Sequence, residues 1–316
     1  MSETAPTIRE SDADQLQPEA IERTLRGLWQ DMVKQNTDVT QVRMLNLLAF
    51  FPEQPSMEVR QAINAIAVQH PGRAITLAPD EHAPRVETTI ACRTGGEKLR
   101  ACGEQIVLRG TVNGEPVHSL AIALLLGGLP ITVWWHGTVN FDDHVFHQLA
   151  ATADHVVLDS RTWPGPIAQL PLLAQMLHTD NQHAWISDLR WVALTSWRRI
   201  IAHSFDVTAA RQILPEIGEI SIEYGAQEGA VVDAIYLAAW WMSRTGRVQA
   251  RLEHNTTEIV LRTRSAPGTQ RRDLRIALRA VQSEESINRI EVLCTGERYG
   301  RVLFEALPGK RAVRTE

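Results

Sequence analysis

The 316-residue sequence contains little that would connect it with export or with a membrane. It has three cysteines, an odd number that argues against a structural disulfide framework, and no apolar stretch of about 18 residues that could cross a bilayer. The N-terminal segment has neither the basic region nor the apolar core of a signal peptide. We therefore expect a cytoplasmic protein without membrane contact, with residues 1–17 as a flexible acidic tail.

The sequence also lacks the motifs of several enzyme classes. Neither G-x-G-x-x-G nor G-x-x-x-x-G-K-[ST] occurs, which disfavours a dinucleotide or nucleoside triphosphate site. No G-x-S-x-G elbow of a serine hydrolase is found. His144 and His147 could offer two metal ligands from one helix, but no third ligand stands at a suitable spacing. We expect no cofactor, no metal and no catalytic set.

What is present is concentrated in two segments, the first of which is LPITVWWHGTVNFDDHVFHQLAATADHVVLDSR. Residues 131–135 and 155–158 are short apolar runs typical of buried strands, and the segment between them is an amphipathic helix that Asp142 or Asp143 can cap. Such a unit predicts two parallel strands that end at one edge of a sheet, where open α/β sheets bind ligands or partners. The polar residues at this predicted edge are His136, Asp159, Ser160 and Arg161.

The second segment is SDLRWVALTSWRRIIAHSF, residues 187–205. Its apolar residues recur at helical spacing, and Asp188 is placed to orient a group near the start of the helix. Tryptophan and arginine are the residues most enriched at interface hot spots, although a tryptophan is more often part of a core. The candidates for an interface or a ligand site in the two segments are Trp134, Trp135, Asp188, Trp191, Trp197 and Arg198, with Trp197 and Arg198 as partner anchors if they are exposed.

Taken in order, the blocks LPITVWWHG, DHVVLDSRTW and SDLRWVALTSWRRIIAHSFD resemble the OpcA family, the glucose-6-phosphate dehydrogenase assembly proteins. The similarity extends over roughly residues 20 to 310. The resemblance implies a non-catalytic protein that binds oligomeric glucose-6-phosphate dehydrogenase, promotes its active oligomer and acts as an allosteric activator. It would thereby support NADPH production in the oxidative pentose phosphate pathway.

The hydrophobic periodicity predicts an α/β protein made of two α/β halves with mixed sheets. The break at Trp163-Pro164-Gly165-Pro166 divides residues 18–162 from residues 163–316. Beyond residue 247 the period changes to two, which predicts an antiparallel meander at the end of the second half. The strands of this meander are expected near 247–252, 258–264, 273–279, 289–294 and 301–306.

The predicted meander is rich in arginine. Residues 244–316 carry fourteen Arg and one Lys against nine acidic residues, a net charge of +6. Alternation places Arg275 and Arg279 on the face opposite the apolar residues. Interleaved Glu253, Glu291 and Glu305 could neutralise this face, or an anionic surface of the dehydrogenase could complete it. Few aromatic residues accompany the arginines, so nucleic-acid binding is disfavoured.

Cys92 and Cys102 are candidates for redox regulation, because some relatives of the OpcA family are thought to respond to redox conditions. The residues themselves favour unpaired thiols. With Gly95-Gly96 as a two-residue turn, Cys92 would oppose Leu99 rather than Cys102.

A second functional hypothesis remains beside the regulator. It is a sugar-phosphate sensor or small-molecule enzyme that uses His136, Asp159, Ser160 and Arg161 at the sheet edge. Turnover measured without the dehydrogenase would distinguish this hypothesis from the regulator.

Overall fold

The computed structural model describes residues 9–11, 17–35, 38–78, 84–92, 100–110, 116–177, 184–227, 229–247, 249–254, 258–264, 273–295, 299–306 and 313–315. The chain forms two compact units. Unit 1 consists of residues 1–159 and 172–187, and unit 2 consists of residues 160–171 and 188–316. Each unit has its own sheet, which confirms an α/β protein with two mixed sheets.

The sheet of unit 1 has nine strands among the described residues. Its order is β1-β5-β6-β4-β3-β7-β8-β9, and β2 pairs with β6. The strands are β1 (Arg9–Ser11), β2 (Val39–Gln41), β3 (Asn46–Phe50), β4 (Arg73–Ala78), β5 (Arg85–Cys92), β6 (Arg100–Arg109), β7 (Ile131–Trp135), β8 (His155–Leu158) and β9 (Trp185–Asp188).

Strands β6, β4, β3, β7 and β8 are parallel to one another. Numbered along the chain, β6-β4-β3-β7-β8-β9 reads 3-2-1-4-5-6, the order of the dinucleotide-binding Rossmann fold. The strand β5, antiparallel to β6, stands where that fold has a second crossover helix. Such a sheet places its ligand crevice where the strand order reverses, here between β3 and β7.

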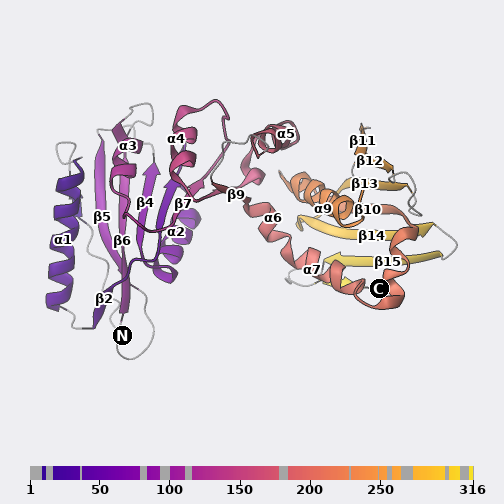
Figure 1. The fold of residues 1–316 in the computed structure, drawn as a ribbon, viewed down its shortest axis with the longest axis horizontal. Helices are drawn as coiled ribbons and strands as arrows, with labels where there is room; N and C mark the ends of the chain where they lie inside the picture. The colour runs from indigo at the N-terminus through magenta and orange to yellow at the C-terminus, as the bar shows by residue number, and fades with distance from the viewer. Residues whose placement is uncertain are drawn as a thin grey trace. The chain divides into compact units, whose positions relative to one another are not determined.

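Helices cover both faces of this sheet (Figure 1). They are α1 (Pro18–Gln35), α2 (Met57–Gln69), α3 (Pro116–Ala123) and α4 (His144–Thr152). Ser56 caps α2 by accepting the N–H of Val59, and Asp143 caps α4 by accepting the N–H of Val145 at 2.8 Å, which confirms the predicted start of α4.

A buried arginine fastens α1 to the sheet. Arg73 on β4 is 2% exposed and donates to Glu104 on β6, with Nε to Oε2 at 2.8 Å, and to Glu22 on α1. Glu104 also accepts hydrogen bonds from Trp29 (2.9 Å) and Gln41 (2.8 Å). Burial alone would lower the pKa of Arg73, but the two carboxylates outweigh burial and raise this pKa. The guanidinium therefore stays charged inside the unit.

The expected unpaired state of Cys92 and Cys102 is wrong in this structure. The two residues are directly opposite each other on β5 and β6 and form a disulfide. The predicted pairing of Cys92 with Leu99 assumed a two-residue turn, and the observed register requires a longer connection. Gly95 and Gly96 lie outside the described residues. Cys102 packs with Leu28 of α1, so the disulfide lies beneath that helix.

Unit 2 contains a seven-stranded sheet in the order β11-β12-β13-β10-β14-β15-β16, counted over the described residues. The strands are β10 (Ile217–Gly225), β11 (Gln249–His254), β12 (Glu258–Arg264), β13 (Leu274–Val281), β14 (Ile287–Thr295), β15 (Tyr299–Ala306) and β16 (Val313–Thr315). The predicted antiparallel strands are present, but they do not form one continuous meander. Strand β10 lies between β13 and β14, parallel to β13 and antiparallel to β14.

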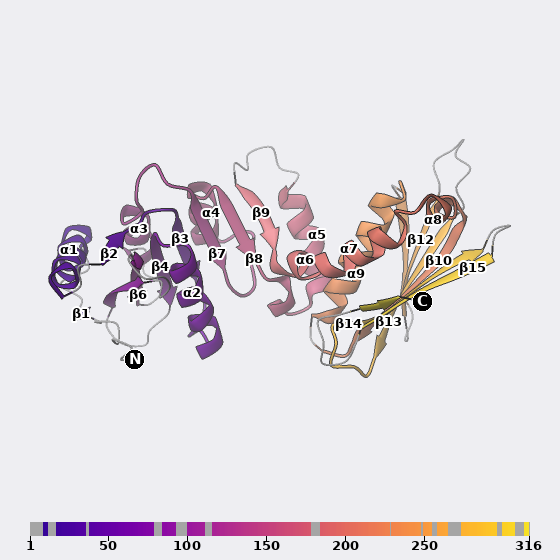
Figure 2. The same ribbon diagram turned by 90° about the horizontal axis from the view of Figure 1, so that it is seen from below.

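Helix α9 (Ala230–Arg244) packs on one face of this sheet, over β10, β13 and β14 (Figures 1 and 2). The other short helices of the described residues are η2 (Ser160–Thr162), α5 (Pro166–Leu177), α6 (Leu189–Ala193), α7 (Thr195–Ser204), α8 (Thr208–Arg211) and η3 (Leu214–Glu216). On α7 the predicted apolar stripe is buried at Leu194, Ile201 and Phe205. None of the helices within the described ranges is long and apolar enough to span a membrane.

Candidate partner-binding site

The crevice position of unit 1 is filled by aromatic side chains. Phe50 and Trp135 are the last residues of β3 and β7, and their rings stack with centroids 3.9 Å apart. Phe146 from α4 packs edge-on against Trp135 at 5.1 Å, and the Trp135 indole N–H donates to the carbonyl of Thr138. The position that a Rossmann fold keeps open for its ligand is therefore occupied by the protein's own side chains.

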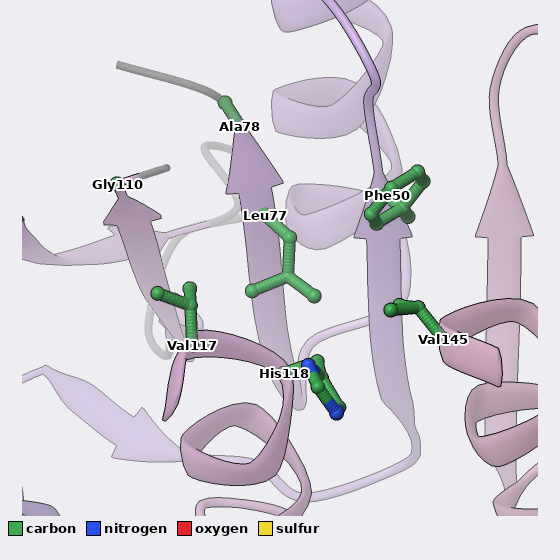
Figure 3. A pocket seen from close by; sticks show the side chains of 7 residues that line it. All are labelled: Phe50, Leu77, Ala78, Gly110, Val117, His118 and Val145. Carbon is green, nitrogen blue, oxygen red and sulfur yellow. The ribbon is translucent and has the colours of Figure 1, made fainter. Parts of the chain in front are cut away.

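Little space remains beside this stack. The hollow in Figure 3 has a volume of about 10 Å³, which is barely enough for one water. It is lined by Phe50, Leu77, Ala78, Gly110, Val117, His118 and Val145. The segment after β3 reads Phe-Pro-Glu-Gln-Pro-Ser and has no glycine, so it lacks the close backbone approach that holds a pyrophosphate. Over the described residues, this edge does not fit a dinucleotide.

Trp134 and Trp135 are core residues. Trp134 is 9% exposed and lies in a cluster with Phe51 and residues of α2, and Trp135 is 2% exposed. The next residue, His136, is half-buried beside Phe51, with ring centroids 5.2 Å apart. Two of the candidate tryptophans thus belong to the core of unit 1.

The predicted edge cluster is divided between the two units. Strands β7 and β8 are neighbouring and parallel, as expected, and His136 and Asp159 follow them in unit 1. Ser160 and Arg161 belong to unit 2. Ser160 is buried and its N–H donates to Asp188 at 3.3 Å, while the backbone of Arg161 approaches Gly229 so closely that a Cβ there would lie 2.6 Å from the Arg161 carbonyl.

Asp188 is the centre of a buried polar network in unit 2. Its Oδ1 accepts the N–H of Arg190 at 2.9 Å and so caps α6. Its Oδ2 accepts the hydroxyl of Tyr236 on α9 at 2.6 Å. Burial, followed by the charge of Asp188, raises the pKa of Tyr236 far above its usual value. The Tyr236 hydroxyl therefore stays protonated at physiological pH and remains a hydrogen-bond donor to Asp188.

A second buried carboxylate holds the same helix. Asp233 on α9 is 1% exposed and accepts two hydrogen bonds from the Arg190 guanidinium, one of them from Nε to Oδ1 at 2.8 Å. The hydroxyl of Ser286 donates to Asp233 as well. Helix α6 is thus fixed to α9 at Asp188 and at Arg190. A short helix of five residues would not persist without such contacts.

Although α6 is fixed firmly, it buries none of its own residues. Leu189, Trp191 and Val192 are 36%, 38% and 55% exposed. The guanidinium carbon of Arg198 on α7 lies 3.4 Å from the centroid of the Trp191 ring, a cation–π contact. Trp197, which was expected as an anchor together with Arg198 if both were exposed, packs partly buried against the core, and it is Trp191 that contacts Arg198.

Arg198 lacks an acidic partner among the described residues. Its Nη2 donates to the Thr195 hydroxyl at 3.0 Å, and its Nη1 is buried without any hydrogen bond in that part of the chain. Burial, followed by the charge of Arg244, lowers the pKa of Arg198. The guanidinium that contacts Trp191 therefore lies near a second positive charge.

The comparisons with known proteins bear on these same segments. Residues 63–175 match the family described as glucose-6-phosphate dehydrogenase subunit N-terminal domain, and residues 184–298 match the corresponding C-terminal domain. The chain belongs to the OpcA family. The C-terminal match includes α6, α7, α9 and most of the second sheet.

Two relatives are described as "Putative OxPP cycle protein OpcA". The protein from Synechococcus elongatus is 29% identical over 84% of this chain and 64% of its own length. The one from Synechocystis sp. is 31% identical over 61% of this chain and 41% of its own length. The chain therefore spans less than two thirds of these OpcA relatives.

Solved structures give weaker similarities. An oxidoreductase from Sinorhizobium meliloti has a TM-score of 0.42 and 12% identity, over 87% of this chain and 77% of that one. A myo-inositol dehydrogenase from Lactobacillus casei has a TM-score of 0.42 and 9% identity, over 86% and 78%. Likenesses at this level support no conclusion about this member of the OpcA family.

The arginine-rich face of the second sheet is largely paired within the chain. Arg275 pairs with Glu219 and, at 2.6 Å, with Glu258, and Arg279 pairs with Glu258 at 3.0 Å. The interleaving glutamates expected from the sequence neutralise other arginines, as Glu253 does for Arg262. A role for Arg275 and Arg279 in binding the dehydrogenase remains a prediction, in which charge reversal weakens association in a salt-sensitive way.

Sequence reasoning missed several residues of the unit 2 network. Tyr236 and Asp233 lie on α9, more than forty residues from Asp188 and Arg190. Asp233 gave one usable signal, since a single acidic residue in the apolar run AVVDAIYLAAWW is expected to have a buried partner. The residues near Asp233 in the sequence do not reveal that this partner is Arg190.

Proposed function

We propose that this chain is a non-catalytic assembly factor that binds glucose-6-phosphate dehydrogenase, favours its active oligomer and acts as an allosteric activator. The observation that carries this proposal is the match of both halves to domains described as those of a glucose-6-phosphate dehydrogenase subunit. The relatives described as OxPP cycle proteins support a place in oxidative pentose phosphate metabolism, and thus in NADPH supply.

Two features of the molecule support a regulator rather than an enzyme. The aromatic stack of Phe50 and Trp135 occupies the crevice position of unit 1. Helix α6 exposes apolar residues, as a protein-binding surface does. A regulator needs only differential affinity for two states of its partner, and a tenfold shift in their populations corresponds to about 1.4 kcal/mol.

The test measures dehydrogenase rate against glucose-6-phosphate concentration, with and without the purified chain, together with size-exclusion chromatography of the mixture. We expect a stable complex and a lower half-saturating concentration or a higher maximal rate. The chain alone, assayed with glucose-6-phosphate and NADP⁺, is the control for intrinsic turnover. Absence of a complex under both reducing and oxidising conditions would overturn the proposal, and turnover by the chain alone would favour the sensor or enzyme hypothesis.

A further inference from the structure

Helix α6 presents an apolar surface that the rest of unit 2 holds in place. We infer that Leu189, Trp191 and Val192, with Arg198 stacked on Trp191, form the docking surface for an acidic segment of glucose-6-phosphate dehydrogenase. We call these four residues the α6 surface. The inference rests on the proposed function and adds to it the contact surface and the charge of the segment that is bound.

The first argument is the distribution of apolar side chains. Leu189 and Val192, three positions apart, lie on one face of α6, Trp191 lies on the adjoining side, and none of the three is fully buried. Isolated exposed apolar residues are ordinary, but an exposed group that includes a tryptophan is typical of protein-binding sites. Burial of these side chains against a partner would stabilise the complex by about 25 cal/mol per Å² of apolar surface removed from water.

The second argument is rigidity. Asp188 caps α6, Tyr236 holds Asp188, and Arg190 is held by Asp233. Buried charged hydrogen bonds of this kind are unfavourable to break, so α6 is ordered before any partner arrives. A surface that is already ordered loses less conformational entropy on binding, which is the usual basis of a strong contact over a small area.

The third argument selects the chemistry of the partner. No ion pair to a carboxylate is formed by Arg198, Arg199 or Arg244 within the described residues, and Arg198 has a buried Nη1 without a hydrogen bond there. The nearest acidic residue on the same helical segment, Asp206, interacts instead with His203 and Arg211. A basic surface next to an apolar one is complementary to an acidic partner segment that also carries apolar side chains.

The experiment compares two exposed valines of unit 2. Val192 lies on α6 and Val207 precedes α8, and they are 55% and 67% exposed. Affinity for glucose-6-phosphate dehydrogenase is measured by biolayer interferometry for the wild-type chain, Val192→Asp and Val207→Asp, with thermal unfolding of each variant. We expect about a tenfold or larger loss of affinity for Val192→Asp, as for a residue at an interface hot spot, and less than about a twofold change for Val207→Asp.

Arg198→Gln tests the charge of the partner segment. It should weaken binding at low ionic strength by several fold and reduce the slope of affinity against salt concentration, because one attractive charge is lost. Unchanged salt dependence in Arg198→Gln would overturn the acidic character of the partner segment.

Other occupants of the α6 surface give distinct results. If the wild-type chain binds the dehydrogenase and both valine variants bind it with the same affinity, the α6 surface is rejected and the proposed function stays intact. If the wild-type chain does not bind the dehydrogenase, both are rejected. Sedimentation equilibrium of the chain alone would reveal a second copy as the occupant if Val192→Asp abolished a dimer. A large drop in unfolding temperature for Val192→Asp, with full binding in the milder Val192→Ser, would show that the surface serves the chain's own fold and would overturn the inference.

Discussion

In each unit an arginine pairs with a buried carboxylate, Glu104 in unit 1 and Asp233 in unit 2, but the two networks hold very different helices. In unit 1, Arg73 joins Glu104 to Glu22 and thereby fastens α1, which also buries Ile21, Leu25 and Leu28. In unit 2, the Arg190–Asp233 pair fastens α6, none of whose residues is fully buried. The first network reinforces the packing of several buried side chains, whereas the second holds a helix that contributes no fully buried side chain.

This difference indicates what a buried ion pair can accomplish. Such a pair is seldom more stabilising than well-packed apolar residues, since both ions lose their hydration. It does fix one geometry, because removing either partner leaves an uncompensated charge. A helix whose apolar side chains are left exposed needs that kind of support, and the network of Asp188, Arg190, Asp233 and Tyr236 supplies it.

Removing Arg73 should give the largest effect on stability. Arg73→Met leaves Glu104, 4% exposed, without its cation, and the loss of one partner of a buried pair is expected to destabilise unit 1 by about 3–5 kcal/mol. Hydrogen exchange followed by mass spectrometry should show faster exchange in α1 and β4 and unchanged protection in α9. Arg23→Met, an exposed position on α1, is the matched control. Equal exchange in α1 for both variants would show that apolar packing alone fixes that helix.

Reducing the Cys92–Cys102 disulfide should have the next largest effect, again confined to unit 1. The cysteines are ten positions apart, and opening a loop of that size lowers stability by about 2–3 kcal/mol in the chain-entropy description. Urea unfolding with and without dithiothreitol measures the difference. The double variant Cys92→Ser/Cys102→Ser should resemble the reduced protein and should not respond to the reductant. A response that persists in the double variant would point to Cys294, the buried free thiol among the described residues, as its source.

Tyr236→Phe should have the smallest effect on stability of the three changes, and it removes only one hydrogen bond. It deletes one hydroxyl that donates to Asp188 and keeps the ring, so stability should fall by only about 0.5–1.5 kcal/mol. Because the lost bond supports the cap of α6, exchange should rise in residues 189–193 before it rises elsewhere in unit 2. Affinity for the dehydrogenase should fall with it. Unchanged exchange in α6 would mean that Arg190 and Asp233 suffice to hold that helix.

The elements that sequence predicted well are those with local causes. The apolar stripe along α7, the Asp143 cap of α4 and the apolar runs of β7 and β8 depend on residues within a few positions of each other. The same is true of the alternating strands in the second half. Hydrophobic period and capping chemistry were sufficient for these elements.

The failures have non-local causes. The placement of β10 between β13 and β14 joins strands fifty or more residues apart, and no turn residue specifies it. The register of Cys92 with Cys102 depends on the length of a connection whose turn residues suggested a shorter one. The partnership of Asp188 with Tyr236 links positions 48 residues apart. In each case the deciding contact arises only after the chain has folded back on itself.

The stack of Phe50 on Trp135 also affects how unit 1 responds to its surroundings. A dinucleotide-binding domain is stabilised by its bound cofactor through mass action, by about 2.7 kcal/mol when the cofactor concentration is a hundred times the dissociation constant. Its stability therefore varies with the concentration of the nucleotide. Here two aromatic side chains occupy the position of that cofactor, and they are part of the chain and cannot dissociate. The contribution of this stack to the stability of unit 1 therefore does not depend on the concentration of any nucleotide.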